Sequence, residues 1–122
     1  MTVTGRLTTH VLDTVHGRPA VGMTIELWRL SPDSEERTLV VTTRTGPDGR
    51  TSNPLLAGDD LHPGVYELVF DVAAYFAALG VSTPLPPFLD RVPIRFGIAD
   101  ADAHYHVPLL ASPWSYSTYR GS

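Results

Sequence analysis

The stretch MTIELWRL, residues 23–30, decides the fold class because its hydrophobic residues recur at every second position. Met23, Ile25 and Leu27 share one face of an extended chain, and the residues between them share the other. This alternation is typical of a β-strand with one buried face. The stretch therefore predicts a strand of a sheet that covers a core on one side.

Segments of the same kind recur along the rest of the chain. Eleven prolines and ten glycines separate them, and the turns at 16–19 (HGRP) and 46–49 (GPDG) place Gly or Pro where tight turns need special dihedral angles. Short strands with frequent turns are typical of an antiparallel sandwich or barrel, so we expect an all-β fold. Eight strands are predicted, at 7–13, 23–30, 38–44, 51–55, 64–71, 92–98, 104–110 and 115–120.

One helix interrupts this pattern. In residues 71–80, Asp71 can cap the first turn, four alanines favour helix, and Gly80 would end it. The chain has 122 residues and no internal repeat, linker or low-complexity tract. A chain of this length suits one compact domain, so residues 1–122 are expected to form a single domain.

The composition excludes several classes of protein. The net charge is −4 and the nine basic residues, all arginine, form no run, which disfavours nucleic-acid binding. Without cysteine there is no disulfide, thiolate metal site or cysteine nucleophile. No apolar stretch is long enough to span a bilayer, and the first residues lack the basic and apolar segments of a secretory signal. We expect a cytoplasmic protein.

Three histidines lie on predicted strands. On 104–110, period two puts His104 and His106 on one face and Tyr105 and Val107 on the core face. His10 lies on the face of its strand that points away from the core. We therefore expect a polar site on a sheet surface. His104 is expected to be structural, although its position also lets it support His106.

Two other readings of the histidines deserve a test. His104, His106 and His10 could bind zinc as three neutral imidazoles with an open position, but no carboxylate is placed to orient them. His16 in a turn and His62 in a loop are expected to be solvated.

Six ordered segments carry a resemblance to a known family. They are HVLD (10–13), GRPA (17–20), DGR (48–50), PFLDRVPIRF (87–96), HYHVPLL (104–110) and YRGS (119–122). Together they resemble the 5-hydroxyisourate hydrolases, the transthyretin-related protein family, from about residue 5 to the last residue.

The resemblance implies a fold, an assembly and an activity. The fold would be a transthyretin-like β-sandwich of two four-stranded sheets with one short helix. Two dimers would form a homotetramer, with the active site in a channel between subunits. The enzyme would hydrolyse 5-hydroxyisourate to 2-oxo-4-hydroxy-4-carboxy-5-ureidoimidazoline, a step of purine breakdown, without a metal or organic cofactor.

The resemblance also implies site residues, all of them present. His10, Arg50 and His106 would be catalytic, and the tail would bind substrate through Tyr119, Arg120, Gly121 and Ser122. The transport protein transthyretin lacks the two histidines, the arginine and this tail. Histidines suit general acid and base work, and an arginine can stabilise a developing oxyanion. Which histidine is the base stays open, and Arg120 alternatively orders the tail through an ion pair.

Two other functions remain to be weighed. On the same fold, the chain could be a binding protein that holds a small aromatic ligand in the channel, since fold alone does not fix function. A purely structural sandwich, such as an adhesion module, would be a monomer in which His10 and His106 have no role.

Overall fold

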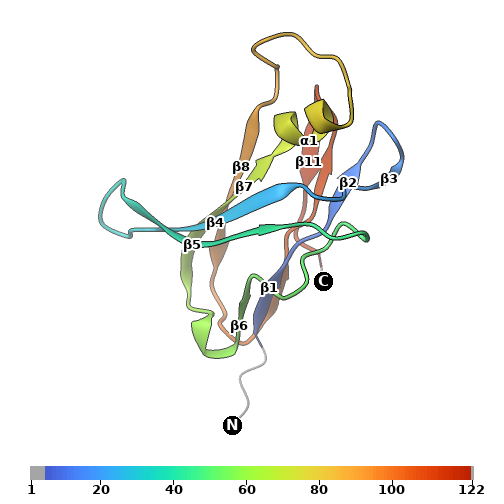
Figure 1. The fold of residues 1–122 in the computed structure, drawn as a ribbon. Helices are drawn as coiled ribbons and strands as arrows, with labels where there is room; N and C mark the ends of the chain where they lie inside the picture. The colour runs from blue at the N-terminus through green and yellow to red at the C-terminus, as the bar shows by residue number, and fades with distance from the viewer. Residues whose placement is uncertain (1–4, 122) are drawn as a thin grey trace.

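The computed structural model describes residues 5–121 and places them in two layers of β-strands with a short helix at one end (Figure 1). The strands are β1 (Arg6–Thr8), β2 (Val11–Asp13), β3 (Arg18–Pro19), β4 (Thr24–Leu30), β5 (Arg37–Arg44), β6 (Leu56–Ala57), β7 (Gly64–Asp71), β8 (Arg91–Ile98), β9 (His104–His106), β10 (Leu109–Ala111) and β11 (Tyr116–Thr118). The helices are the 3₁₀ turn η1 (Gly58–Asp60) and α1 (Val72–Ala78).

One layer is an antiparallel sheet in the order β5-β4-β7-β8. β4 and β8 alternate as the sequence predicts, with Ile25 and Leu27 of β4 and Val92 of β8 buried. β7 is buried on both faces from Tyr66 to Phe70, and its Leu68 pairs with Leu27. These side chains pack in a common core with residues of the other layer, such as Leu109. The predictions for 23–30, 38–44, 64–71 and 92–98 are therefore confirmed within a residue at each end.

The other layer is interrupted. The sequence predicts continuous strands at 7–13 and 104–110, but each divides in two, which gives sheets of order β6-β1-β9 and β11-β10-β2-β3. The expectation of two four-stranded sheets is therefore wrong in number. Pro108 has no amide hydrogen to donate, so the ladder is irregular at this point. The two chains nevertheless stay paired, because the Val107 amide donates to the Thr8 carbonyl and the Leu109 amide to the His10 carbonyl, each at 2.9 Å.

The strand predicted at 51–55 is also wrong. Residues 51–54 form bends, in which the Thr51 hydroxyl donates to the Asn53 carbonyl at 2.6 Å. Pro54 cannot donate to a ladder, and pairing with β1 begins only where the Leu55 amide donates to the Leu7 carbonyl at 2.8 Å. The segment instead lies beside β1, and both line the same pocket. The last strand is shorter than predicted, Tyr116–Thr118 rather than 115–120.

The helix forms where the sequence predicts it. The Asp71 carboxylate accepts a hydrogen bond from the Ala74 amide at 3.4 Å, and Gly80 follows with a φ of 76°. Within residues 5–121, no helix has the length and apolar character needed to cross a membrane.

A polar cluster ties this helix to the other layer. The buried Asp13 carboxylate accepts hydrogen bonds from the Tyr75 hydroxyl of α1 at 2.7 Å and from the His16 Nδ1 at 2.6 Å. His16 is exposed, as the sequence predicts, and its ring is held at the surface by this carboxylate three residues earlier in the chain. Burial alone would raise the pKa of Asp13, but hydrogen bonds from His16 and Tyr75 lower it overall.

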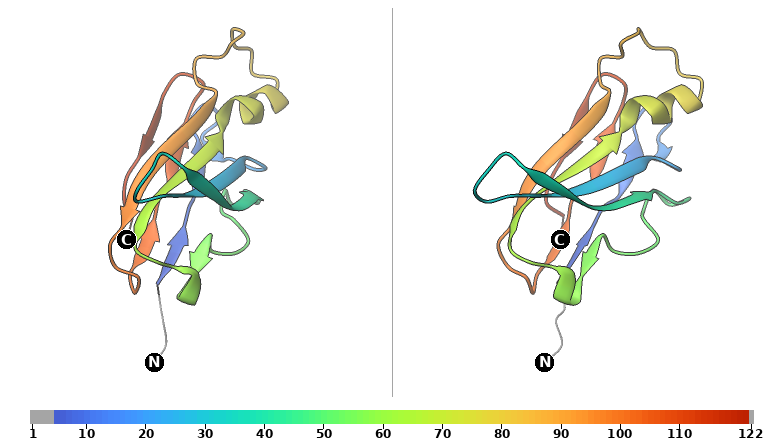
Figure 2. Two further views of the ribbon diagram at one scale, coloured as in Figure 1. Left: turned by 90° about the vertical axis from the view of Figure 1, so that its left-hand side faces the viewer. Right: turned by 60° about the vertical axis from the view of Figure 1, so that its left-hand side comes forward.

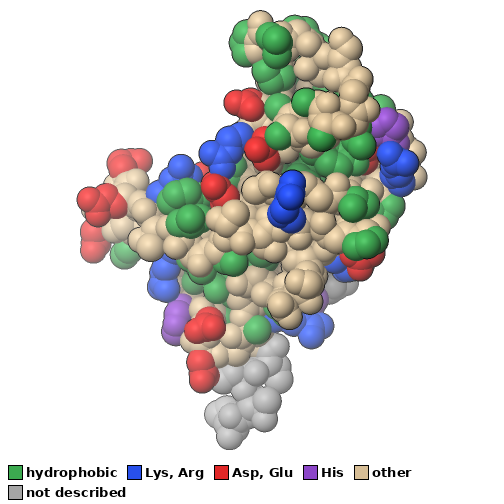
Figure 3. All heavy atoms as spheres, in the orientation of Figure 1, with side chains coloured by type: hydrophobic (Ala, Val, Ile, Leu, Met, Phe, Trp, Pro, Cys, Tyr) green, Lys and Arg blue, Asp and Glu red, His purple; other side chains and the backbone are tan. Residues whose placement is uncertain are grey.

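Acidic residues lie in several parts of the molecule, and Asp13 contacts His16. Acidic side chains gather at the tip of the loop that joins β4 and β5, where Asp33, Glu35 and Glu36 are exposed (Figure 3). The charge of the molecule therefore says little about the sign of its ligand.

Candidate active site

A tight turn between β5 and β6 places Arg50 beside His10. In this turn the Gly49 amide donates to the Gly46 carbonyl at 2.9 Å, and the Arg50 amide donates to the Asp48 carboxylate at 2.9 Å. Gly49 has a φ of +80°, and a Cβ there would stand 2.5 Å from the Val11 carbonyl oxygen. Only glycine fits such a position. The turn therefore packs directly on the chain that carries His10.

His10 is held with a defined tautomer. Its backbone forms an antiparallel bridge with Arg50, and its Nε2 lies 2.8 Å from the Asp48 carbonyl oxygen. A carbonyl oxygen only accepts, so Nε2 must carry a hydrogen. In the neutral ring, Nδ1 is then the nitrogen with a free lone pair, and it is the atom that could take a proton.

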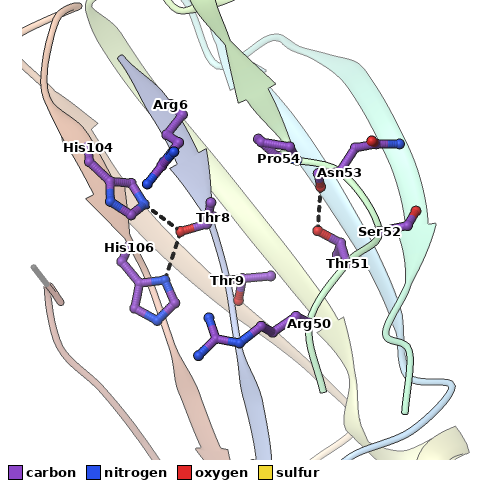
Figure 4. Close-up of a pocket in the computed structure, with 10 residues that line it drawn as sticks. All are labelled: Arg6, Thr8, Thr9, Arg50, Thr51, Ser52, Asn53, Pro54, His104 and His106. Carbon is purple, nitrogen blue, oxygen red and sulfur yellow. Dashed lines mark hydrogen bonds between the residues drawn. The ribbon is translucent and has the colours of Figure 1, made fainter. Parts of the chain in front are cut away.

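His106 lies opposite Thr8 in the parallel pair of β1 and β9. Its Nδ1 lies 2.8 Å from the Thr8 hydroxyl, and the same hydroxyl lies 2.8 Å from Nε2 of His104 (Figure 4). With Nδ1 occupied, Nε2 of His106 is the nitrogen left for a ligand. The guanidinium of Arg50 reaches toward this ring from across the pocket (Figure 4).

The electrostatic environment favours neutral rings. Burial lowers the pKa of His106, and the neighbouring Arg50, His104 and His10 lower it further. Burial also lowers the pKa of His104, with a further contribution from Arg6. Both imidazoles are therefore uncharged at neutral pH.

Arg50 and His106 line an open pocket of about 350 Å³, and His10, which is bridged to Arg50, is not among the residues that line it. Two arginines and two histidines line it, and no carboxylate does, so it suits a ligand rich in carbonyl oxygens or negative charge. The lining residues are Arg6, Thr8, Thr9, Arg50, Thr51, Ser52, Asn53, Pro54, His104 and His106 (Figure 4).

The tail divides between two places. The Gly121 amide donates to the His106 carbonyl at 2.7 Å, so this residue contacts the site. Tyr119 and Arg120 instead line a second pocket, between β8 and the end of β11, where the Arg120 guanidinium lies 4.3 Å from the centre of the Tyr105 ring. Within one chain the structure therefore does not bring these two side chains to His106. Ser122 lies outside the described residues.

The zinc reading finds no support in the geometry. Among residues 5–121, no three His, Cys, Asp or Glu side chains are grouped so that they could hold a metal ion. The nitrogens of His104 and His106 that face each other are bridged by the Thr8 hydroxyl instead.

Sequence reasoning missed part of this pocket. Thr8 shares a strand face with His10, which period two reveals, but its contact with His106 depends on a pairing between residues 98 positions apart. No local sequence pattern marks Arg6 or residues 51–54 as pocket residues, because they line the pocket only through the way the bent segment 51–54 lies beside β1.

Residues 7–121 match the model of the HIUase/Transthyretin family. The chain is 58% identical over 122 residues to 5-hydroxyisourate hydrolase 2 of Rhizobium meliloti, with all of both chains covered. It is 58% identical over 118 residues to 5-hydroxyisourate hydrolase of Pseudomonas aeruginosa, covering 97% of this chain and 92% of that one.

Solved structures agree in fold. An (S)-allantoin synthase superposes with a TM-score of 0.92 at 52% identity, covering 98% of this chain and only 44% of that one, so this chain spans less than half of it. Sea bream transthyretin in complex with thyroxine superposes with a TM-score of 0.83 at 31% identity, over 95% of this chain and 94% of that one. Because the family model matches residues 7–121 and two hydrolases of nearly the same length are 58% identical, this chain belongs to the HIUase/Transthyretin family.

Proposed function

We propose that this protein hydrolyses 5-hydroxyisourate to 2-oxo-4-hydroxy-4-carboxy-5-ureidoimidazoline, in the degradation of urate. The observation that carries the proposal is the convergence of His10, Arg50 and His106 on one face of the sandwich. The choice of substrate follows from the two relatives at 58% identity, which are named 5-hydroxyisourate hydrolase.

The first step is the attack of water on a ring carbonyl. Nδ1 of His10 takes a proton from the water as it attacks, because Nε2 already donates to the Asp48 carbonyl. That carbonyl also stabilises the positive charge that the ring acquires. Arg50 then stabilises the oxyanion formed on the substrate, which is the work of a fixed cation in a partly desolvated site.

The second step breaks the carbon–nitrogen bond of the ring. Nε2 of His106 faces the pocket and protonates the leaving nitrogen, so that the ring opens to a carboxylic acid. No metal or organic cofactor takes part in either step.

Assembly completes the site in this proposal. β8 and β11 are both edge strands and lie side by side around the pocket that holds Tyr119 and Arg120 (Figure 2). Unpaired edges readily take up a strand from another chain. Pairing of two copies along these edges, followed by dimerisation of the dimers, gives the homotetramer, in which Tyr119, Arg120, Gly121 and Ser122 bind substrate.

Exposed aromatic side chains support this assembly. Phe88 and Trp114 stack with ring centres 5.9 Å apart although they are 69% and 57% exposed, and Leu85 is 92% exposed. Apolar surface of this kind commonly marks a contact between proteins. In this proposal the protein is a single-domain homotetramer of the cytoplasm.

A second candidate function is the carriage of a small aromatic ligand. The structural relative solved with thyroxine favours it as a use of the same fold. Carriage of a ligand gives no role to His10, whose tautomer is fixed, or to the neighbouring Arg50, so we place this function second.

A direct assay decides between the two. Purified protein is mixed with freshly generated 5-hydroxyisourate, and the ultraviolet decay is followed for wild type, His10→Ala and Arg50→Ala. We expect fast decay with wild type and a loss of about 10²- to 10⁴-fold in His10→Ala. Wild-type decay no faster than the spontaneous reaction rejects the hydrolase and leaves the carrier.

A further inference from the structure

One hydroxyl group joins two histidines at the pocket. Thr8 Oγ1 lies 2.8 Å from Nδ1 of His106 and 2.8 Å from Nε2 of His104 (Figure 4). A hydroxyl has a single hydrogen, so it donates to one ring and accepts from the other. The tautomers of the two histidines are therefore coupled through Thr8.

Only two arrangements satisfy this network with neutral rings. In the first, His104 Nε2–H donates to Thr8, Thr8 donates to His106 Nδ1, and Nε2 of His106 carries a hydrogen that faces the pocket. In the second, every hydrogen bond is reversed, and Nε2 of His106 presents a lone pair. The first arrangement makes His106 a proton donor, and the second makes it an acceptor.

We propose that Thr8 and His104 are positioning residues that act through His106, as a proton wire between its Nε2 in the pocket and solvent at His104. The proposal rests on the hydrolase function proposed above, and assigns to two residues outside the catalytic set the task of supplying the leaving-group proton.

The wire takes one proton from solvent, which leaves a hydroxide there until the return transfers release a proton, and the three residues of the wire stay neutral throughout. His106 Nε2–H passes to the leaving nitrogen while the Thr8 proton moves to His106 Nδ1, the His104 Nε2 proton moves to Thr8, and water protonates His104 Nδ1. His106 thereby exchanges one neutral tautomer for the other and never becomes an imidazolate. The carboxylic acid product then returns its proton to Nε2, and the same transfers run backward to release one proton from His104.

The surroundings make such a wire necessary. Burial and the charged neighbours Arg50 and Arg6 lower the pKa values of His106 and His104, so neither imidazolium is available as an acid at neutral pH. A neutral imidazole alone is a very weak acid, and it donates effectively only if its other nitrogen gains a proton at the same time. His104 is only partly buried, so its ring can exchange protons with water.

The experiment removes the wire without removing His106. Thr8→Val keeps the shape and loses the hydroxyl, Thr8→Ser keeps the hydroxyl, and His104→Gln can hold Thr8 by a hydrogen bond but cannot exchange protons. Thr14→Val is the matched control, because its hydroxyl bonds only the Ala111 carbonyl, outside the pocket. For each, kcat, KM and the dependence of rate on the deuterium fraction of the solvent are measured.

We expect Thr8→Val and His104→Gln to lose about 10²-fold in kcat, at the lower end of the effect of proton-transfer catalysis, with KM little changed. We expect a curved dependence on deuterium fraction in wild type and a linear one in both variants, with Thr8→Ser and Thr14→Val close to wild type.

Two results would overturn the wire while leaving the hydrolase intact. One is wild-type kcat and curvature in His104→Gln, which decides the matter even if Thr8→Val fails to fold. The other is a Thr8→Ser protein that folds but stays as slow as Thr8→Val. The hydrolase itself fails by a different result, namely wild-type decay at the spontaneous rate.

Discussion

The backbone of Gly121 packs against the imidazole of His106. The two residues form an antiparallel bridge, and a Cβ at position 121 would stand 2.6 Å from Cδ2 and 3.2 Å from Cγ of the ring. No side chain fits at that distance, so the glycine of the tail fixes one edge of the ring while Thr8 holds the opposite edge. The tail therefore contacts the site through its backbone.

Gly121→Ala should rotate the His106 ring, so that its Nε2 no longer faces the pocket. We expect kcat to fall about 10²-fold, because a displacement of about 1 Å in a catalytic group has effects of this size. Steady-state kinetics measure the fall in kcat, and the NMR signals of the His106 ring report its rotation. Gly97→Ala is the control, because a Cβ there meets no atom within 4 Å; equal kinetics in the two variants would contradict the packing argument.

Stability should fall as the pH is lowered through the histidine range. The folded chain lowers the pKa values of His104 and His106, so below pH about 6.5 the unfolded chain binds protons more readily than the folded one. The free energy of unfolding is therefore unaffected well above that pH and declines below it. Urea unfolding at fixed protein concentration tests this, and the decline should be smaller in a His104→Gln, His106→Gln double variant. An equal decline in both proteins would assign it to other groups.

The outcome of sequence reasoning depended on whether a feature was local. Period two identified β4, β7 and β8 and sorted His106 from Tyr105, because the face of a residue follows from its own strand. The break at Pro108 depended on partners elsewhere, because the division of one layer into two sheets is a property of the paired strands. The resemblance to the 5-hydroxyisourate hydrolases implied His10, Arg50 and His106, but nothing local indicated the Thr8 bridge, whose partner His106 is 98 positions away.

Tyr75→Phe should destabilise the fold and leave the chemistry alone. The variant removes the hydroxyl that donates to the buried Asp13 carboxylate, at a cost of about 1–3 kcal/mol in the free energy of unfolding. Burial and Asp13 raise the pKa of Tyr75 to about 12, so the hydroxyl titrates late in a spectrophotometric titration. Unchanged unfolding midpoints in Tyr75→Phe would show that the cluster contributes nothing.

Exhaustive chelation should leave the activity intact. A zinc ion shared by the facing nitrogens of His104 and His106 would have to displace the Thr8 hydroxyl, and Nε2 of His10 is engaged by the Asp48 carbonyl. Protein dialysed against a strong chelator and checked by metal analysis is assayed with and without added Zn²⁺. Loss of activity on dialysis with recovery on Zn²⁺ would restore the metal site as an explanation for the three histidines.

Subunit exchange tests whether the tail serves a neighbouring site. Tyr119 and Arg120 line a pocket between the edge strands β8 and β11, away from His106 of their own chain. If Arg120 acts in the site of a partner, Arg50→Ala and Arg120→Ala tetramers are each slow, but mixed tetramers contain sites with both arginines intact. We expect activity to appear on mixing, at a rate that follows subunit exchange measured by native mass spectrometry. Complete exchange without any gain in activity would mean that Arg120 acts within its own chain, through its contact with Tyr105.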